Sequence, residues 1–159
     1  MSIRPATVGL IIFISICLLV ATAGSLIVNT SIHGWYEQLQ KPAWTPPNWV
    51  FPMVWTTLYL LMGIAAWLVW RKHGLSGGFA ALVVFYIQLT LNLLWSCIFF
   101  GLQMPGMAFV ELLLLWIAIL ITLILFWRAH RIAGLLMSPY LLWVTFAAAI
   151  NYQTWQMNL

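Results

Sequence analysis

Five apolar runs, each long enough to cross a membrane, limit the fold of this sequence more than any other feature. A helix crosses the hydrocarbon core with about 20 apolar residues. Runs of this kind cover residues 8–28, 49–70, 79–100, 106–127 and 132–155. Backbone groups inside a bilayer must find their hydrogen-bond partners within the protein, and helices provide them. We therefore expect an all-α integral membrane bundle of five transmembrane helices, with residues 1–159 forming a single domain.

The charged residues are too few for a soluble protein. Soluble domains carry roughly 25% charged residues, whereas only 5% of this 159-residue chain is charged. The net charge of +4 therefore does not indicate a nucleic-acid partner. Instead, the cations lie at or near the ends of the apolar runs, where they set the orientation of the helices in the membrane.

The lysines and arginines predict that orientation. Five of the six belong to the N-terminal segment and to the second and fourth connections: Arg4, Arg71, Lys72, Arg128 and Arg131. The opposite side holds Lys41 alone. Because positive residues favour the cytoplasmic side, we expect the N-terminus to lie inside and the first loop and C-terminus outside. The cell membrane is the expected location. The letters "ATA" before Gly24 could instead mark a signal-peptide cleavage site, but the apolar run is long for a signal peptide.

Three of the runs each carry a face that mixes aromatic and polar residues. At helical spacing the faces are Phe51, Trp55, Tyr59 and Met62; Gln88, Asn92, Trp95 and Phe99; and Trp143, Ala147, Ile150, Asn151 and Thr154. Most of these residues share one depth, beneath the first loop. Polar groups in hydrocarbon need a partner or a cavity, and aromatic walls with a few polar groups are typical of binding pockets. We predict a pocket; ordinary interhelical packing is the alternative.

Several other residues have simpler explanations or exclude a function. Tryptophans at the span ends fit aromatic belts, and Glu111, one turn inside its helix, fits a carboxylate that snorkels or interacts with the helix dipole. The three histidines, His33, His73 and His130, lie in predicted connections, which disfavours a bis-histidine haem site. The chain has no aspartate and no cysteine or histidine spacing typical of a metal site, so no metal and no catalytic residue is predicted.

The segment "KPAWTPPNWVFPMVW", residues 41–55, combines four prolines with three tryptophans at the start of an apolar run. Pro42, Pro46 and Pro47 hold the chain extended, and Pro47 or Pro52 fits the first turn of a helix. We interpret the segment as a stiff lid over the predicted pocket, with Trp44 and Trp49 as its apolar contacts.

Three segments together resemble the translocator protein family, also called TspO/MBR or tryptophan-rich sensory proteins. They are "WYEQLQKPAWTPPNWVFPMVWTTLY", "QLTLNLLWSCIFFG" and "SPYLLWVTFAAAINYQTW". The resemblance covers nearly the whole chain, and it suggests a prokaryotic member. It implies a five-helix bundle, usually a homodimer, that binds protoporphyrin IX, haem and related flat ligands under the first loop, with no obligatory cofactor. The binding positions that it implies here are Trp55, Asn92, Trp95, Trp143, Ala147 and Ile150, with Ala23, Trp35, Tyr36 and Trp44 in addition.

Two further expectations concern partners. The animal members' sterol motif needs a cation shortly after its tyrosine, but here Tyr152 is followed by "QTWQMNL", which argues against tight cholesterol binding. Gly77 and Ala81 are four residues apart, a spacing that permits close helix contact. We expect the helix that contains them to lie near a homodimer interface, although packing within one bundle would explain the spacing equally.

Three functions stay open at this point. The first is a receptor or sensor that binds tetrapyrroles, the second a transporter of porphyrin or sterol, and the third an enzyme that degrades protoporphyrin in light. The sequence favours binding because an aromatic pocket is the feature it indicates most clearly. It shows no inverted repeat of the kind common in secondary transporters. A photochemical reaction would need only a porphyrin, oxygen and a nearby indole, so that alternative is kept.

Overall fold

The computed structural model describes residues 5–159 and contains only helices and connecting segments in that range. The elements are α1 (Pro5–Asn29), α2 (Trp35–Gln38), α3 (Val50–Gly77), α4 (Phe79–Ser96), the π-helix η1 (Cys97–Gly101), α5 (Pro105–Ala129) and α6 (Arg131–Met157). Five of the helical segments are long and apolar enough to cross a membrane, with η1 continuing α4. The expected all-α bundle with five membrane-spanning helices is confirmed, and α2 is an addition that the sequence did not predict.

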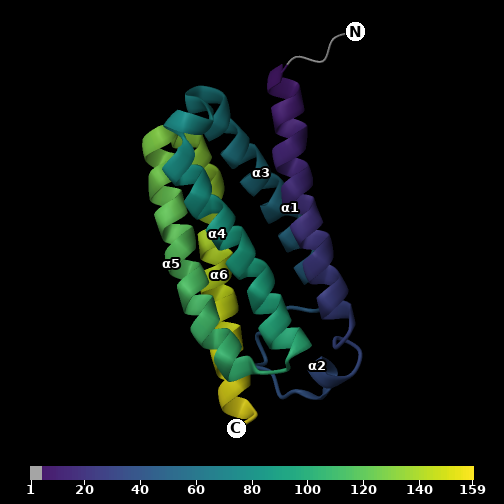
Figure 1. Ribbon diagram of the computed structural model, residues 1–159. Coiled ribbons are helices and arrows are strands. Elements are labelled where there is room, and N and C mark those ends of the chain that lie inside the picture. Colours follow the sequence, from purple (N-terminus) through teal and green to yellow (C-terminus); the bar gives the residue numbers. More distant parts are fainter. Residues whose placement is uncertain (1–4) are drawn as a thin grey trace.

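The long helices run alternately up and down, so their connections gather at two ends of the bundle (Figure 1). One end, which we call the cation end, holds the α3–α4 and α5–α6 turns with Arg71, Lys72, Arg128 and Arg131. The other, which we call the loop end, holds residues 30–49, the turn before α5 and the C-terminus. Arg4, which also entered the orientation argument, lies outside the described residues. The grouping of the connections agrees with the predicted topology; which end faces the cytoplasm stays a prediction.

Helix α1 packs against α3 in the half of the bundle nearest the cation end. Gly63 allows this approach, because a Cβ atom at that position would lie 2.9 Å from the Cα atom of Ile14. Nearby, the Trp67 Nε1 donates a hydrogen bond to the Ala6 carbonyl at 2.8 Å, and the Phe13 and Trp70 rings lie 6.0 Å apart. This close contact fixes α1 near the cation end, and a cavity lies beside α1 at the loop end.

The α3–α4 turn corrects one expectation from the sequence. Gly74 interrupts α3 with a φ of 68°, a conformation that glycine adopts without steric cost. Helix α3 then ends at Gly77, and α4 begins only at Phe79. Gly77 and Ala81 therefore do not lie on one continuous helix, and Ala81 is buried inside the protein's own core. Their spacing cannot form the helix-contact motif that we expected, so the homodimer stays a prediction without this support.

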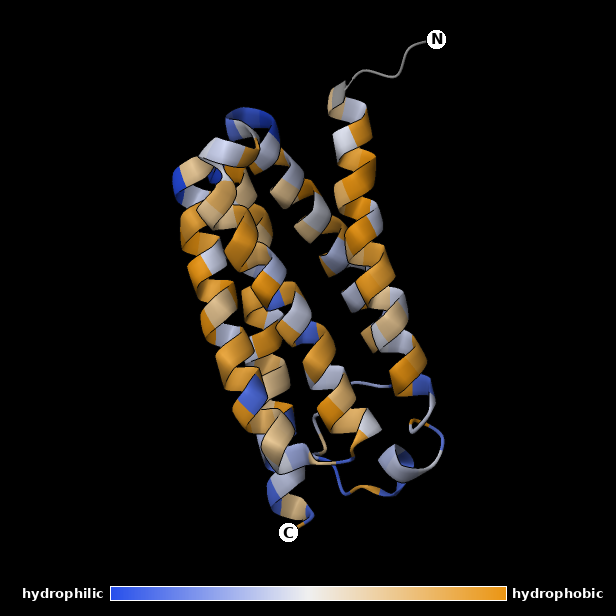
Figure 2. Cartoon of the chain, in the orientation of Figure 1, coloured by the Kyte–Doolittle hydropathy of each residue, from blue (hydrophilic) through white to orange (hydrophobic). Residues whose placement is uncertain are grey.

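The outside of the bundle is as apolar as its inside. Figure 2 shows hydrophobic residues covering the long helices and hydrophilic residues gathered mainly at the ends. Exposed side chains on α5 include Val110, Leu114, Ile117 and Ile121, whereas Glu111 and Thr122 are buried. This distribution is what a bilayer requires, since lipid is as apolar as the protein core.

The Gly63 contact generates a prediction about stability. Gly63→Ala forces α1 and α3 apart, because the clashing atom is backbone and cannot rotate away. We expect a loss of about 1–3 kcal/mol in the free energy of unfolding, measured by denaturant unfolding in detergent. Gly24→Ala is the matched control: its nearest contact would be an ordinary 3.6 Å from Ser96 Oγ. An equal loss in both variants would contradict the proposed contact.

The arrangement of the ends generates a prediction about orientation. In a variant without native cysteines, we expect Gln38→Cys to react with a membrane-impermeant maleimide from outside the cell and Ser76→Cys to react only after lysis. Both positions are exposed, at opposite ends of the bundle. The reverse pattern would invert the orientation predicted from the cations.

Candidate ligand-binding cavity

A cavity of about 250 Å³ lies at the loop end, between α1 and the other long helices. Its walls come from α1, α3, α4, η1, α6 and the first loop. Most lining side chains are apolar or aromatic, with a few hydroxyl and amide groups among them. The residues are Ala21, Gly24, Ser25, Val28, Asn29, Ile32, Tyr36, Asn48, Phe51, Pro52, Trp55, Thr56, Tyr59, Trp95, Ser96, Phe99, Phe100, Ala147, Ile150, Asn151 and Thr154.

A hydrogen-bonded chain of three side chains joins α3, α4 and α6 beside the cavity. The Tyr59 hydroxyl donates to Asn92 Oδ1, and Asn92 Nδ2 donates to the Tyr140 hydroxyl at 2.8 Å. Asn92 is only 4% exposed, so an unpaired amide there would carry a large desolvation cost. The three residues satisfy one another, and they fix Tyr59 as a wall of the cavity.

A second polar connection joins α4, α5 and α6. Trp95 Nε1 donates to Asn151 Oδ1 at 3.0 Å, and Asn151 Nδ2 donates to the Pro105 carbonyl at 2.8 Å. Asn151 is 1% exposed and uses both ends of its amide. It therefore holds the Trp95 indole in a fixed orientation, with the ring against the cavity.

The π-helix η1 supplies the aromatic end of the cavity. Its wider turn replaces the last turn of α4 and buries Phe99 and Phe100 together. Trp95 stacks on Phe99 with ring centroids 5.2 Å apart, and Tyr36 from the first loop lies 5.4 Å from Phe100. Single π-turns inside helices are frequent at functional sites. Here η1 places Phe99 and Phe100 in one aromatic cluster with Trp95 of α4 and Tyr36 of the first loop.

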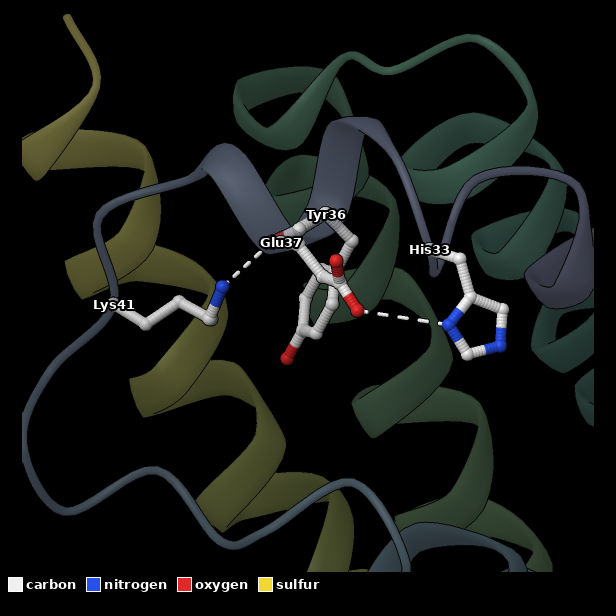
Figure 3. Close-up of polar contacts among 4 residues, drawn as sticks. All are labelled: His33, Tyr36, Glu37 and Lys41. Carbon is white, nitrogen blue, oxygen red and sulfur yellow. Dashed lines mark hydrogen bonds and ion pairs between the residues drawn. The ribbon is translucent and has the colours of Figure 1, made fainter.

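The first loop covers this cluster through Tyr36 and Lys41. Figure 3 shows the Tyr36 ring pointing between the helices while Lys41 reaches back to its backbone. The Lys41 Nζ donates to the Tyr36 carbonyl at 2.5 Å and lies 4.4 Å from the centroid of the Tyr36 ring. Burial lowers the pKa of Lys41, and Glu37 partly opposes that shift. The exposed His33–Glu37 pair, 3.5 Å apart, adds little to the loop.

The C-terminal turn of α6 holds the other part of the loop. The Asn158 side chain makes a reciprocal pair with the backbone of Gln40: the Gln40 N–H donates to Oδ1 at 3.0 Å, and Nδ2 donates to the Gln40 carbonyl at 2.8 Å. The same Nδ2 also donates to Thr154, whose side chain lines the cavity. Residues 118 apart in the sequence thus join the loop to a cavity wall.

The structure brings five of the ten predicted site residues to the cavity wall: Tyr36, Trp55, Trp95, Ala147 and Ile150. Three more lie directly behind that wall. Asn92 holds Tyr59, Trp35 contacts Phe99 with centroids 5.7 Å apart, and Trp143 contacts Phe51 at 5.9 Å. Their position does not test whether they bind a ligand.

The other two predicted residues, Ala23 and Trp44, are not part of the wall. The α1 face toward the cavity is formed instead by Ala21, Gly24, Ser25, Val28 and Asn29, and Ile32 adds to the wall just beyond the end of α1. The α1 residues follow helical spacing and all but Val28 are small or polar, a pattern that the sequence itself contains. The Trp44 ring packs on the Phe146 ring of α6, with centroids 5.7 Å apart, as expected for a lid contact. Trp49, the other expected contact, is instead 65% exposed. Pro52, in the first turn of α3, occupies the expected helix-start position.

Glu111 does not snorkel to solvent, which was one of the two explanations offered for it from the sequence. A snorkelling carboxylate would reach solvent, but Glu111 is 6% exposed. Neither of its oxygens has a hydrogen-bond partner among the described residues. It lies outside the cavity wall, so the structure gives it no part in the candidate site.

The cavity combines neutral polar groups with an aromatic wall. Its polar groups are hydroxyls and amides. The amides of Asn151, in the wall, and Asn92, behind it, already make hydrogen bonds within the protein. Within residues 5–159, no three histidine, cysteine or acidic side chains come together as a metal site would require. A flat apolar molecule with a few polar substituents would match the aromatic walls.

Comparisons with known proteins agree with these features. The sequence profile of the TspO/MBR family matches residues 13–156. The tryptophan-rich protein TspO of Chlorobaculum tepidum is 44% identical over 149 residues, 91% of this chain and 92% of that protein. The protein CrtK of Rhodobacter capsulatus is 40% identical over 87% of both chains. The human translocator protein is 38% identical over 88% of this chain and 86% of its own. This chain belongs to the TspO/MBR family of multi-pass membrane proteins.

Proposed function

We propose that this protein is a membrane receptor or sensor that binds a tetrapyrrole, such as protoporphyrin IX or haem, in the cavity beneath the first loop. Family membership and relatives named as sensory and translocator proteins support the receptor or sensor role. The observation that carries the ligand class is the aromatic wall: Trp55, Trp95, Phe99 and Phe100 line one cavity. Flat π-systems gain contact on such walls beyond the area they bury.

The size of the cavity shapes the proposal. At about 250 Å³, it is slightly smaller than the roughly 300–1,000 Å³ typical of ligand pockets. A four-ring macrocycle with its side chains therefore requires the loop to move outward or one edge to protrude. Exposed lining residues Ser25 on α1 and Pro52 and Thr56 on α3 mark the side where an edge could protrude. Polar substituents there would meet hydroxyl groups and the membrane surface.

One experiment separates the receptor from its alternatives. Purified protein is mixed with protoporphyrin IX, and the absorption spectrum is followed in the dark and in light. Stable saturable binding without bleaching supports the receptor. Loss of the porphyrin only in light, abolished by Trp95→Phe, would favour the degrading enzyme, and porphyrin flux into sealed vesicles would favour the transporter. No saturable binding in either condition would contradict the proposal.

A matched pair of variants on α6 tests the location of the site. Ala147→Phe fills the cavity with a ring, whereas Ala149→Phe adds the same ring on the exposed side of the same helix. We expect the first to weaken porphyrin binding at least about tenfold, equivalent to about 1.4 kcal/mol, and the second to change it little. Fluorescence titration measures both, and unchanged melting temperatures show that both fold. Full-strength binding by Ala147→Phe would exclude this cavity.

The pairing of Asn158 with Gln40 predicts the rate of ligand release. If the loop must open for exchange, Asn158→Ala removes two bonds that hold it closed. One such bond contributes about 1 kcal/mol, so we expect porphyrin to dissociate about fivefold faster or more in a stopped-flow displacement assay. Gln156→Ala, an exposed position two residues earlier, serves as the control. An unchanged dissociation rate in Asn158→Ala would show that exchange does not need this part of the loop to open.

A further inference from the structure

The cation end of the bundle contains a second recess, about 330 Å³ in volume. It lies where the end of α3 meets the turn between α5 and α6. Leu68, Arg71, Lys72 and His130 line it. Water occupies about 30 Å³ per molecule in the liquid, so the recess has room for a headgroup rather than for one or two waters. It is separate from the cavity at the loop end and plays no part in the proposed function.

The charge of this end cannot be balanced within the protein. Figure 2 shows hydrophilic residues at the α3–α4 and α5–α6 turns, and Arg71, Lys72, Arg128 and Arg131 are all there. The chain has only two acidic residues. Glu37 belongs to the first loop, and Glu111 is buried in the part of α5 nearest the loop end. The counter-charge for the recess therefore comes from outside the chain: from ions in solution, from a bound anion or from the membrane.

Hydrogen-bond donors in the recess remain available for such an anion. The Lys72 Nζ donates to the last carbonyl of α5, at Ala129, at 2.7 Å, which leaves two of its three N–H groups. His130 lines the recess, and its Nδ1 atom has no partner among the described residues; that atom is closed to solvent, so the ring must turn for it to reach a bound anion. Arg71 lies over the Trp67 ring, 5.1 Å from its centroid, an arrangement that orients the guanidinium while leaving its edge free.

The surroundings of these donors distinguish a lipid from a free anion. Leu68, Arg71 and Lys72 follow one another at helical spacing on α3, so the apolar side chain lies one turn deeper than the two cations. A phospholipid has the same sequence of groups, a phosphate followed by an acyl chain. Basic recesses between transmembrane helices are known to bind anionic lipid headgroups. A free phosphate would use the cations but gain nothing from Leu68 or from the apolar helix surface beyond it.

We propose that the recess formed by Leu68, Arg71, Lys72 and His130 is a binding site for the phosphate headgroup of an anionic phospholipid. The headgroup neutralises Arg71 and Lys72 and accepts a hydrogen bond from the His130 ring, while the acyl chain follows the apolar surface below Leu68. The lipid then joins the end of α3 to the α5–α6 turn, where Lys72 and His73 also make hydrogen bonds to the Ala129 carbonyl.

The test uses the purified full-length chain in detergent, titrated with phosphatidylglycerol or phosphatidylcholine and observed by native mass spectrometry. We expect one phosphatidylglycerol to be retained in preference to phosphatidylcholine. Arg71→Gln should weaken that retention about fivefold, the effect typical of one cation near a membrane surface. Arg71→Lys should restore most of it, and His130→Ala should also weaken it.

Arg128→Gln is the matched control, because it removes the same charge at the same end without lining the recess. It should leave phosphatidylglycerol retention nearly unchanged. Equal losses in Arg71→Gln and Arg128→Gln would show only diffuse surface attraction and overturn the proposal. Equal retention of the two lipids, or displacement of phosphatidylglycerol by an equal concentration of inorganic phosphate, would overturn it as well. Arg71 is exposed, so its variants are expected to fold, and their melting temperatures verify this.

Discussion

The bundle depends on the pairing of a few amide side chains inside hydrocarbon. In the hydrocarbon core of a bilayer no water can satisfy a buried polar group, so an amide there is stabilised by partners within the protein. Asn92 and Asn151 do so by each joining side chains or backbone from two other helices. Through them α3, α4, α5 and α6 are held in register at the depth of the cavity. Apolar packing alone would not specify this register, since lipid is as apolar as the core.

The same pairing explains why a cavity can exist at all. Four helices are fixed to one another by the two amides, whereas α1 is fixed mainly to α3, by contacts at Gly63 and Trp67 near the cation end. At the loop end α1 touches α4 near Gly24 but leaves a space toward α3 and α6, and small residues such as Gly24 and Ser25 line that space. The loop and η1 close it with aromatic side chains instead of a packed helix face. The cavity at the loop end therefore results from the placement of two sets of contacts: the hydrogen bonds of Asn92 and Asn151, which do not involve α1, and the α1–α3 contacts near the cation end.

Much of this arrangement could be predicted from the sequence, and the missing parts share a physical reason. The positions of the long helices follow from the apolar runs, although α3 continues to Gly77. The cavity faces follow from helical spacing, as for Asn92 and Trp95 on α4 and for Ala147 and Ile150 on α6. Ala23, which the family resemblance implies, lies one residue before Gly24 on α1, and helical spacing places Gly24 on the cavity wall instead. The π-turn at η1 and the pairing of Gln40 with Asn158 involve backbone groups, which no side-chain pattern reports. The burial of Glu111 does not follow from the sequence, because the depth of a residue along its helix does not reveal whether the side chain turns toward solvent.

The two ends of the molecule use opposite means to interact with their surroundings. At the loop end the polar groups are neutral and mostly paired within the protein, so a ligand there gains chiefly from contact with aromatic rings. At the cation end the charges have no acidic partner in the chain, so an anion gains from electrostatic attraction and from donors that remain free. The first kind of site discriminates by shape and the second by charge. Under the two proposals, a protein with so few charged residues, 5% of the chain, holds an apolar ligand at one end and an anionic lipid at the other without competition between them.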